Sequence, residues 1–104
     1  MHFERTYDLD EEEALARLHA LTDYWSRRHG INASWNGNEV SLSGKVKGVK
    51  FDGQVRVGGG RIAAEVHAGF LAEKLGGRQY IERKLADYLD TNHSLEELQA
   101  RVPR

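Results

Sequence analysis

The chain of 104 residues contains no cysteine, a single proline and no long apolar run. The lack of cysteine excludes disulfides and metal sites built on thiolates. The lack of an apolar stretch of about 18 residues argues against a membrane-spanning helix. Neither sign of charge dominates, because 15 lysines and arginines stand against 16 aspartates and glutamates. The net charge of −1 argues against a nucleic-acid-binding protein that depends on a broad basic surface.

The sequence has room for one domain, and we expect that domain to lie in the cytoplasm. A chain of this length can bury most of its apolar surface in a single core. Its first residues lack the basic start and the apolar run of a signal peptide. We expect the domain to span residues 1–90 and residues 91–104 to form a C-terminal tail that is either a short helix or disordered.

Apolar side chains recur with the spacing of strands and helices along the whole domain. Residues 2–9 alternate as in a strand, and residues 11–29 repeat as in a helix. We expect the side chain of Asp10 to cap the start of this helix, with Glu13 at the reciprocal position, and Gly30 to end it. A capping box of Ser94 and Glu97 predicts a short helix in the tail. The other predicted elements are strands at about 31–35, 40–42, 48–57 and 62–68, a short apolar segment at 69–75 and a helix at 78–90.

The alternation of apolar residues in these strands is one-sided, which implies an antiparallel sheet with one covered face. The predicted fold is a two-layer α+β domain in the order strand, helix, four strands, helix, with a helix-grip-like cover over the sheet. The turn Asn36-Gly37-Asn38 predicts a hairpin. Gly58-Gly59-Gly60 predicts a second hairpin rather than a phosphate-binding loop, because a strand and not a helix follows it.

No motif for a catalytic or metal centre stands out, and we expect neither a cofactor nor a metal ion. The five histidines lack the helical spacing and the acidic neighbours of metal ligands. No serine lies in the Gly-x-Ser-x-Gly turn of a nucleophile elbow. Ser41 and Ser43 fall on the polar phase of a strand, so we interpret them as solvated residues.

The charged runs have structural interpretations. The acids at 8–13 suit the start of a helix, where the helix dipole favours negative charge. The expected exposed ion pairs four residues apart are Glu13–Arg17 and Asp23–Arg27. A strip of lysines fits an edge strand that is protected against aggregation. The strip consists of Lys45, Lys47 and Lys50.

Arg5 is the residue that local structure does not explain. It shares the apolar face of the first strand with Phe3, Tyr7 and Leu9. A buried guanidinium is costly unless it is paired. We therefore expect Arg5 to extend to solvent at the strand end, to hold a structural salt bridge, or to face an anionic or carbonyl group of a ligand. Aromatic side chains on the predicted inner faces would fill the core or line a cleft between the long helix and the sheet. The candidate cleft residues are Arg5, Tyr7, Trp25, Trp35, Phe51 and Phe70.

Both ends of the domain resemble one family of small bacterial proteins. The opening segment is Phe3-Glu4-Arg5-Thr6-Tyr7-Asp8-Leu9, similar to apolar-Glu-Arg-Thr-His-x-Leu, with Tyr7 where histidine is common. The closing segments are Gly69-Phe70-Leu71, Ile81-Glu82-Arg83-Lys84-Leu85 and Leu89-Asp90. Over residues 2–90 the chain resembles the polyhydroxyalkanoic acid system protein family, and the tail falls outside the resemblance. The resemblance implies a role near storage-polyester synthesis or storage granules, without a known reaction, cofactor or catalytic residue.

Two hypotheses for the function follow, and a third is weaker. The first is a non-enzymatic accessory protein that binds an apolar or acyl group between the long helix and the sheet. The alternative is an interaction module that docks a polyester synthase or a granule-coat protein through its outer sheet face or through Leu95, Leu98 and Val102 of its tail. A small hydrolase or cyclase would need a titratable group poised in the cleft, and the sequence offers no obvious one. The sequence leaves the oligomeric state open.

Overall fold

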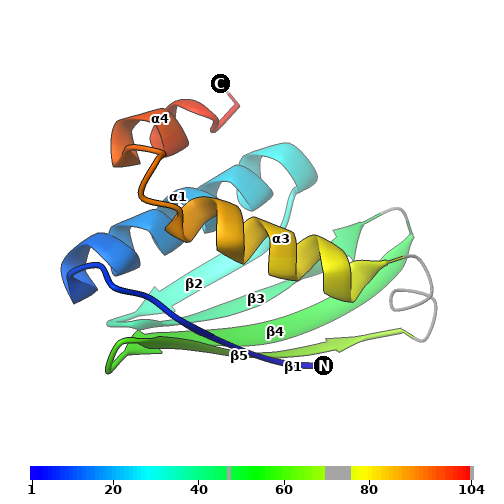
Figure 1. Cartoon of the computed structure of the whole chain (residues 1–104). Helices are drawn as coiled ribbons and strands as arrows, with labels where there is room; N and C mark the ends of the chain where they lie inside the picture. Colours follow the sequence, from blue (N-terminus) through cyan, green and yellow to red (C-terminus); the bar gives the residue numbers. More distant parts are fainter. Residues whose placement is uncertain (47, 70–75, 104) are drawn as a thin grey trace.

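The computed structural model describes residues 1–46, 48–69 and 76–103, which form five strands and three helices in two layers (Figure 1). The elements are β1 (His2–Thr6), α1 (Glu11–His29), β2 (Asn32–Asn36), β3 (Glu39–Val46), β4 (Val49–Gly58), β5 (Arg61–Ala68), α3 (Gly77–Leu89) and α4 (Leu95–Ala100). This confirms the predicted α+β class, the order of the elements and the short helix near the C-terminus. The more specific helix-grip resemblance stays a prediction. The apolar segment expected at 69–75 falls, after residue 69, outside the described residues.

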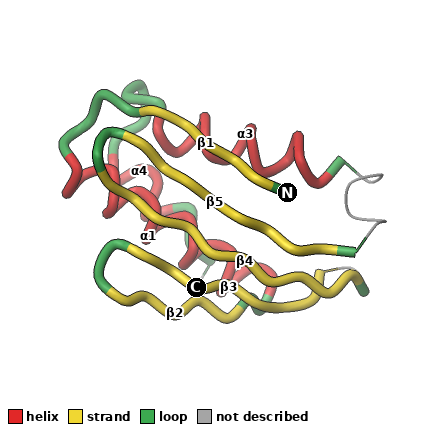
Figure 2. The backbone as a smooth tube through the Cα atoms, turned by 90° about the horizontal axis from the view of Figure 1, so that it is seen from below, coloured by secondary structure: helices red, strands yellow, loops and turns green. Residues whose placement is uncertain are grey.

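All five strands pair antiparallel in one open sheet of order β1-β5-β4-β3-β2. The strands β2 to β5 follow one another as hairpins, whereas β1 pairs with the distant β5, with His2 opposite Glu65. The helix α1 therefore carries the chain from one edge of the sheet to the other. Viewed from below, the strands lie in front of all three helices, so that one face of the sheet is covered and the other is open (Figure 2).

Glycines with a left-handed backbone make the tight turns. Gly59 and Gly60 have φ angles of 63° and 76° and connect β4 to β5. This matches the two-residue hairpin that needs positive φ at both central positions, and it confirms the hairpin interpretation of the triple glycine. The backbone N–H of Gly59 donates to Oε1 of Glu11 at 3.2 Å, so the turn is fastened to the first turn of α1.

The core lies between the sheet and the helices and is closely filled. The inner face of the sheet carries a glycine at position 53, and a Cβ atom there would come within 3.0 Å of the Glu65 carbonyl oxygen. Neighbouring backbone thus occupies the space that a side chain would need. The side chains that are at most 1% exposed include Leu18, Leu21, Val40, Val57, Ile62 and Tyr88.

The helix ends follow the predicted chemistry with one exception. Gly30 ends α1 in the left-handed conformation, and its N–H donates to the carbonyl of Ser26. Ser94 accepts a hydrogen bond of 3.1 Å from the backbone N–H of Glu97, which confirms the predicted cap of α4. The side chain of Asp10 makes no capping hydrogen bond, so its predicted role as a cap is wrong. Three glutamates in the first turn of α1 still meet the positive end of its dipole.

The lysine strip does not lie on an edge strand. Lys45 and Lys50 are opposite one another on β3 and β4, which are both internal strands. The edges are β1 and β2, because the long connection through α1 separates them. The interpretation of the strip as edge protection is therefore wrong for these two residues, and Lys47 lies outside the described residues.

The helix α4 packs on α1 near the end at which α3 terminates (Figure 1). Its Leu98 is 0% exposed and belongs to the main hydrophobic core. Leu95 and Val102 are half-buried. The division into a domain at 1–90 and a tail at 91–104 stays a prediction.

Candidate functional site

The candidate cleft residues are spread over the structure, and the side chains of the two tryptophans have partners within the fold. Trp25 is buried, and its Nε1 donates to the hydroxyl of Tyr80 at 3.2 Å. The Trp35 ring stacks on His19 with 3.8 Å between centroids, and its Nε1 donates to Thr22 Oγ1 at 3.1 Å. These contacts occupy both indole N–H groups.

The other candidates lie on the sheet or next to it. Phe51 is half-buried on β4, and Phe70 falls outside the described residues. The segment after β1 contains Tyr7, whose backbone N–H donates to the Gly60 carbonyl at 3.0 Å. The Tyr7 hydroxyl is buried, and none of the described residues forms a hydrogen bond with it. A buried, unpaired hydroxyl is unusual, and it keeps Tyr7 of interest.

Arg5 is exposed, so the expectation of a buried arginine on β1 is wrong. On this edge strand only Phe3 is buried under the helices, and the side chains beyond it extend into solvent. Among the residues that the structure describes, Arg5 has no hydrogen bond or ion pair. Together with Glu4, Thr6 and Arg61 it lines an open hollow of about 440 Å³.

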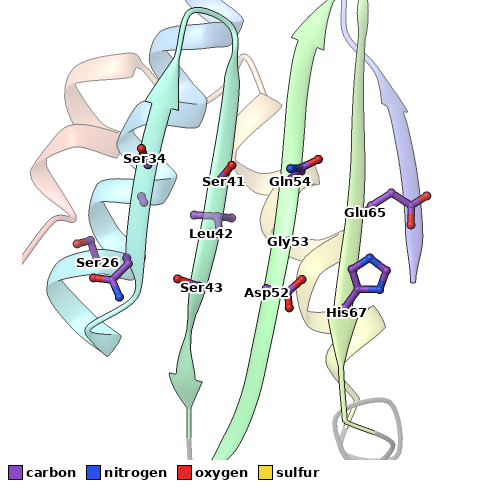
Figure 3. A pocket seen from close by; sticks show the side chains of 12 residues that line it. Ser26, Ser34, Ser41, Leu42, Ser43, Asp52, Gly53, Gln54, Glu65 and His67 are labelled. Atoms are coloured by element: carbon purple, nitrogen blue, oxygen red, sulfur yellow. The ribbon is translucent and has the colours of Figure 1, made fainter.

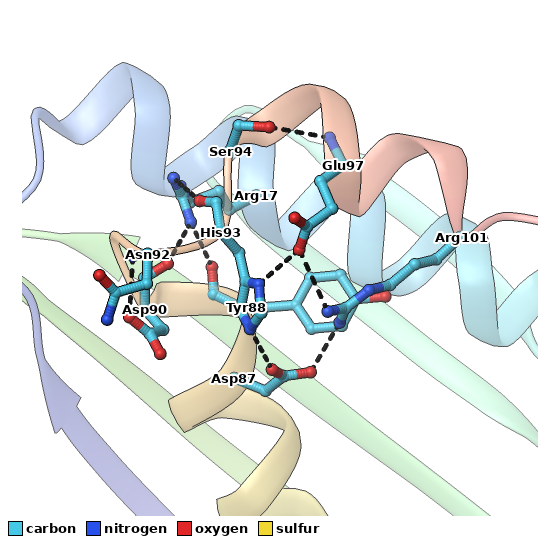
Figure 4. Close-up of polar contacts among 9 residues, drawn as sticks. All are labelled: Arg17, Asp87, Tyr88, Asp90, Asn92, His93, Ser94, Glu97 and Arg101. Atoms are coloured by element: carbon cyan, nitrogen blue, oxygen red, sulfur yellow. Dashed lines mark hydrogen bonds and ion pairs between the residues drawn. The ribbon is translucent and has the colours of Figure 1, made fainter.

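The buried arginine is Arg17 of α1, which is 3% exposed (Figure 4). Its Nη1 donates to the carbonyls of Tyr88 at 3.1 Å and Asp90 at 3.0 Å, and its Nη2 donates to the carbonyl of His93 at 2.7 Å. Glu13 Oε2 lies 3.7 Å from Nε. The expectation that both members of the Glu13–Arg17 pair are exposed is wrong for Arg17. Its side chain points inward and binds the backbone at the end of α3.

Next to this arginine, ionisable side chains of α3, α4 and the residues around α4 join α4 to α3 (Figure 4). His93 Nε2 lies 3.1 Å from Asp87, and His93 Nδ1 contacts Glu97. Arg101 pairs with Asp87 at 2.6 Å and stands over the Tyr88 ring at 5.4 Å. Every charged group faces a partner within the cluster, so we interpret the cluster as structural.

The open face of the sheet carries the largest hollow described, with a volume of about 690 Å³ (Figure 3). Polar side chains line it in two rows that follow from the strand register. One row is Ser34, Ser41, Gln54 and Glu65, and the next is Asn32, Ser43, Asp52 and His67. Hydroxyl, amide, carboxylate and imidazole groups therefore stand side by side across four strands.

The second row contains the residue types of a catalytic triad in an unsuitable order. Nucleophilic catalysis needs the histidine next to the serine hydroxyl whose proton it takes. Here Asp52 stands between Ser43 and His67, opposite both of them in the register. All three residues are exposed. The row is suited to hydrogen bonding with another surface rather than to attack on a substrate.

The edge of this face holds a histidine between two carboxylates. His2 Nδ1 lies 2.5 Å from Glu65, and Nε2 lies 3.3 Å from Glu4. The pKa of His2 is raised above its ordinary value, because the imidazolium can donate to both carboxylates. Glu65 is the larger cause and Glu4 the smaller one. The neighbouring surface thus gains positive charge as the pH falls.

Alternation of polar residues alone could not reveal the two rows. Ser41 and Ser43 were interpreted as solvated residues, and they are exposed. Their alignment with Gln54 and Asp52 depends on the hairpin register. The Asn-Gly turn between β2 and β3 was the available signal, because hairpin turns fix the register of their strands.

No described residues form a group of three or more acidic or histidine side chains that could hold a metal ion. Over the same part of the chain, no helix is long and apolar enough to cross a membrane.

A comparison with protein families matches residues 1–101 to the family described as "Putative polyhydroxyalkanoic acid system protein". The searches of curated proteins and of solved structures found no match. The family match extends through α4, so the expectation that the tail falls outside the resemblance is wrong. Because the match covers nearly the whole chain and both quoted ends of the domain, the protein belongs to the polyhydroxyalkanoic acid system protein family.

Proposed function

We propose that this chain is a non-enzymatic accessory protein of the polyhydroxyalkanoate system that docks a protein partner through the open face of its sheet. The observation that carries the proposal is the hollow of about 690 Å³ with its two aligned polar rows. Interfaces between proteins that also exist separately are about as polar as the rest of the surface and contain roughly ten direct hydrogen bonds. The two rows supply closely spaced donors and acceptors for such hydrogen bonds.

The tail helix is less suited to hold a partner. Docking through the tail rests on Leu95, Leu98 and Val102, and of these Leu98 is fully buried in the protein's own core while the other two are half-buried. Exposing Leu98 would require α4 to leave α1 and the charged cluster around Arg17. The open sheet face needs no such rearrangement.

The acyl-binding hypothesis is the second candidate, and the unpaired buried hydroxyl of Tyr7 favours it. Against it, Leu18, Leu21 and Val57 fill the layer between α1 and the sheet. Arg5 faces solvent and not that layer. Isothermal titration with 3-hydroxyacyl and fatty-acyl ligands tests this candidate, and the absence of heat would remove it. Without the exposed Arg5, the residues proposed for this cleft are Tyr7, Trp25, Trp35, Phe51 and Phe70.

A charged, bulky substitution in the middle of the open face tests the docking proposal. Gln54→Arg places a guanidinium in the hollow, and Gln99→Arg makes the same chemical change on the exposed surface of α4. We expect Gln54→Arg to weaken binding roughly tenfold or more, because the larger side chain fills the hollow and its charge must be desolvated in the interface. Gln99→Arg should bind as the original chain does.

Co-sedimentation with isolated polyhydroxyalkanoate granules measures this binding. Granules with their native protein coat are compared with granules from which the coat has been removed. We expect binding to the coated granules only, and loss of that binding in Gln54→Arg. Equal binding of Gln54→Arg and Gln99→Arg, or equal binding to bare polymer, would contradict a protein partner on the open face.

A further inference from the structure

The outer surface of the helical layer repeats one short pattern on two neighbouring helices. In each helix a tyrosine is followed three and four residues later by two basic residues, so the three side chains share one helix face. We name this group the basic helical patch. It consists of Tyr24, Arg27 and Arg28 of α1 and Tyr80, Arg83 and Lys84 of α3.

Direct contacts join the two halves of the basic helical patch. The Nζ atom of Lys84 lies 5.0 Å from the centre of the Tyr24 ring and 5.8 Å from that of Tyr80. The Tyr80 hydroxyl accepts a hydrogen bond from Trp25, which α1 buries beneath it. The two helices run alongside each other in the layer (Figure 1). The six side chains therefore form one surface.

The cations of the basic helical patch are largely free to meet an external anion. Arg27, Arg28 and Arg83 are exposed, and within the described part of the chain Arg27 and Arg28 have no ion pair. The expected Asp23–Arg27 pair is not formed. Besides Asp23, the carboxylate on these turns is Glu82, which lies 3.8 Å from Arg78. Positive charge is therefore in excess on this part of the surface.

Charge is separated along the molecule. The first turn of α1 contains Glu11, Glu12 and Glu13, and its last turn contains Arg27, Arg28 and His29. The helix α3 begins where α1 ends, so its basic residues lie at the same end of the molecule (Figure 1). A chain with a net charge of −1 thus carries an excess of positive charge at this end of the helical layer, where Asp23 and Glu82 are outnumbered by basic residues. Such a distribution orients the protein toward an anionic surface.

We infer that the basic helical patch docks the protein on an anionic phospholipid surface. Arginine and lysine reach phosphate groups while their alkyl stems lie against apolar material, and tyrosine suits the boundary between water and hydrocarbon. Tyr80 is 39% exposed and is the most exposed large apolar residue described. Neither of the two hollows described is lined by a residue of the basic helical patch. A broad anionic surface therefore fits better than a small enclosed anion.

This orientation would leave the other face of the protein accessible. The helices and the open sheet face lie on opposite sides of the molecule (Figure 2). A lipid surface against α1 and α3 would direct the polar rows away from the lipid. The inference uses different residues from the proposed function, so each can fail without the other.

Co-sedimentation with vesicles tests the inference. The full chain is mixed with vesicles of equal parts phosphatidylglycerol and phosphatidylcholine, and with vesicles of phosphatidylcholine alone. We expect binding to the anionic vesicles only, and a loss of that binding as the salt concentration rises, because screening weakens the attraction between exposed charges. Equal binding to both kinds of vesicle, or no binding at low salt, would overturn the inference.

A pair of charge-matched variants locates the contact. Arg27→Gln combined with Arg28→Gln should weaken vesicle binding roughly 30-fold, since each basic residue near an anionic surface contributes about 1 kcal/mol. Arg56→Gln combined with Arg61→Gln removes the same charge from β4 and β5 and should weaken it only slightly. Equal losses in the two variants would overturn the assignment to this surface. Circular dichroism verifies that both variants keep the fold.

A third arm separates lipid from an acidic protein. Beads coated with polyglutamate offer carboxylates without a hydrocarbon boundary. Binding to these beads without binding to anionic vesicles would overturn the lipid assignment in favour of an acidic protein. The Gln54→Arg variant should bind vesicles as well as the original chain does, which keeps this surface distinct from the open sheet face.

Discussion

The side chain of Arg17 donates a hydrogen bond of 2.7 Å to the backbone carbonyl of His93, which lies 76 positions further along the chain. The same guanidinium donates to the carbonyls of Tyr88 and Asp90. The last carbonyls of a helix have no partner within the helix, and a cation near them also meets the negative end of its dipole. One arginine in α1 thus satisfies the end of α3 and fixes the connection to α4.

Arg17→Ala should lower the free energy of unfolding by about 3–5 kcal/mol, because it removes charge-assisted hydrogen bonds and leaves buried carbonyls unsatisfied. Urea unfolding followed by tryptophan fluorescence measures the change. Arg5→Ala is the matched control, and its effect should stay within about 0.5 kcal/mol, as for other exposed residues without special contacts. Equal losses in the two variants would contradict the assignment of Arg17 as the structural arginine.

Leu98→Ala should destabilise the protein by about 2–5 kcal/mol, the usual range for a leucine that leaves a cavity in the core. The neighbouring Gln99 is exposed, and Gln99→Ala should change stability by less than about 0.5 kcal/mol. A chain that ends at residue 90 should also melt at a lower temperature. An unchanged melting temperature of this shortened chain would contradict the assignment of Leu98 to the hydrophobic core.

The ionisation of His2 should depend on Glu65. Glu65 is the main cause of the raised pKa of His2, so Glu65→Gln should move that pKa back toward its ordinary value of about 6.5. A raised pKa in the folded state means that the stabilising contribution is complete below about pH 6.5 and is lost as the pH rises through the raised pKa. Titration of the His2 ring by NMR checks the shift. A pKa that Glu65→Gln leaves unchanged would contradict the contact.

Gly53→Ala should destabilise the protein by roughly 1–3 kcal/mol, the range for overpacking a well-filled core. The new Cβ atom would lie 3.0 Å from the Glu65 carbonyl oxygen, which is backbone and moves only if β5 shifts away from β4. Gly69→Ala is the control, because a Cβ atom there meets nothing within 4 Å. Thermal unfolding of the two variants should differ clearly, and equal melting temperatures would contradict the close approach at Gly53.

Ser94→Ala should cost about 1 kcal/mol, since the Ser94 side chain accepts the Glu97 N–H at the start of α4. Asp10→Ala should cost less, because the Asp10 side chain makes no capping hydrogen bond in α1. Chemical unfolding of both variants measures the difference. If Asp10→Ala lost more stability than Ser94→Ala, the charge of Asp10 near the dipole of α1 would stabilise the protein more than the capping hydrogen bond of α4 does.

Periodicity and turn chemistry were sufficient to predict the α+β class and the order of the elements. The alternation in β3, β4 and β5 identified the covered face, and the glycines at 37, 59 and 60 mark the hairpins. The prediction for Arg5 was wrong because alternation assigns a face but does not show how far the helices cover it. Arg17 lies between Ala14 and Leu21 on the buried side of α1. Its carbonyl partners lie more than 70 positions away, and no local pattern indicates them.

The candidate sites were harder to predict than the fold. The basic helical patch could have been found in the sequence as a repeated Tyr-x-x-Arg-Arg/Lys pattern, but only the packing of α1 against α3 brings the two copies together. The polar rows of the open face need the register of four strands. In both cases the residue types can be read from the sequence, but only the tertiary structure shows which of them lie next to one another.

The pairing of the first strand with the last sets an order for folding. The N-terminal amine of Met1 donates to the Val66 carbonyl 65 positions away, and β1 pairs only with β5. A ribosome releases β1 first, yet this strand has no partner until β5 has emerged. The four hairpin-connected strands can assemble from contacts that are close in the sequence. Pairing β1 with β5 closes a long loop, so its cost in conformational entropy is met only after β5 has formed. During synthesis the free edge of β5 therefore stays open, and its protection depends on how fast the N-terminal strand returns to it.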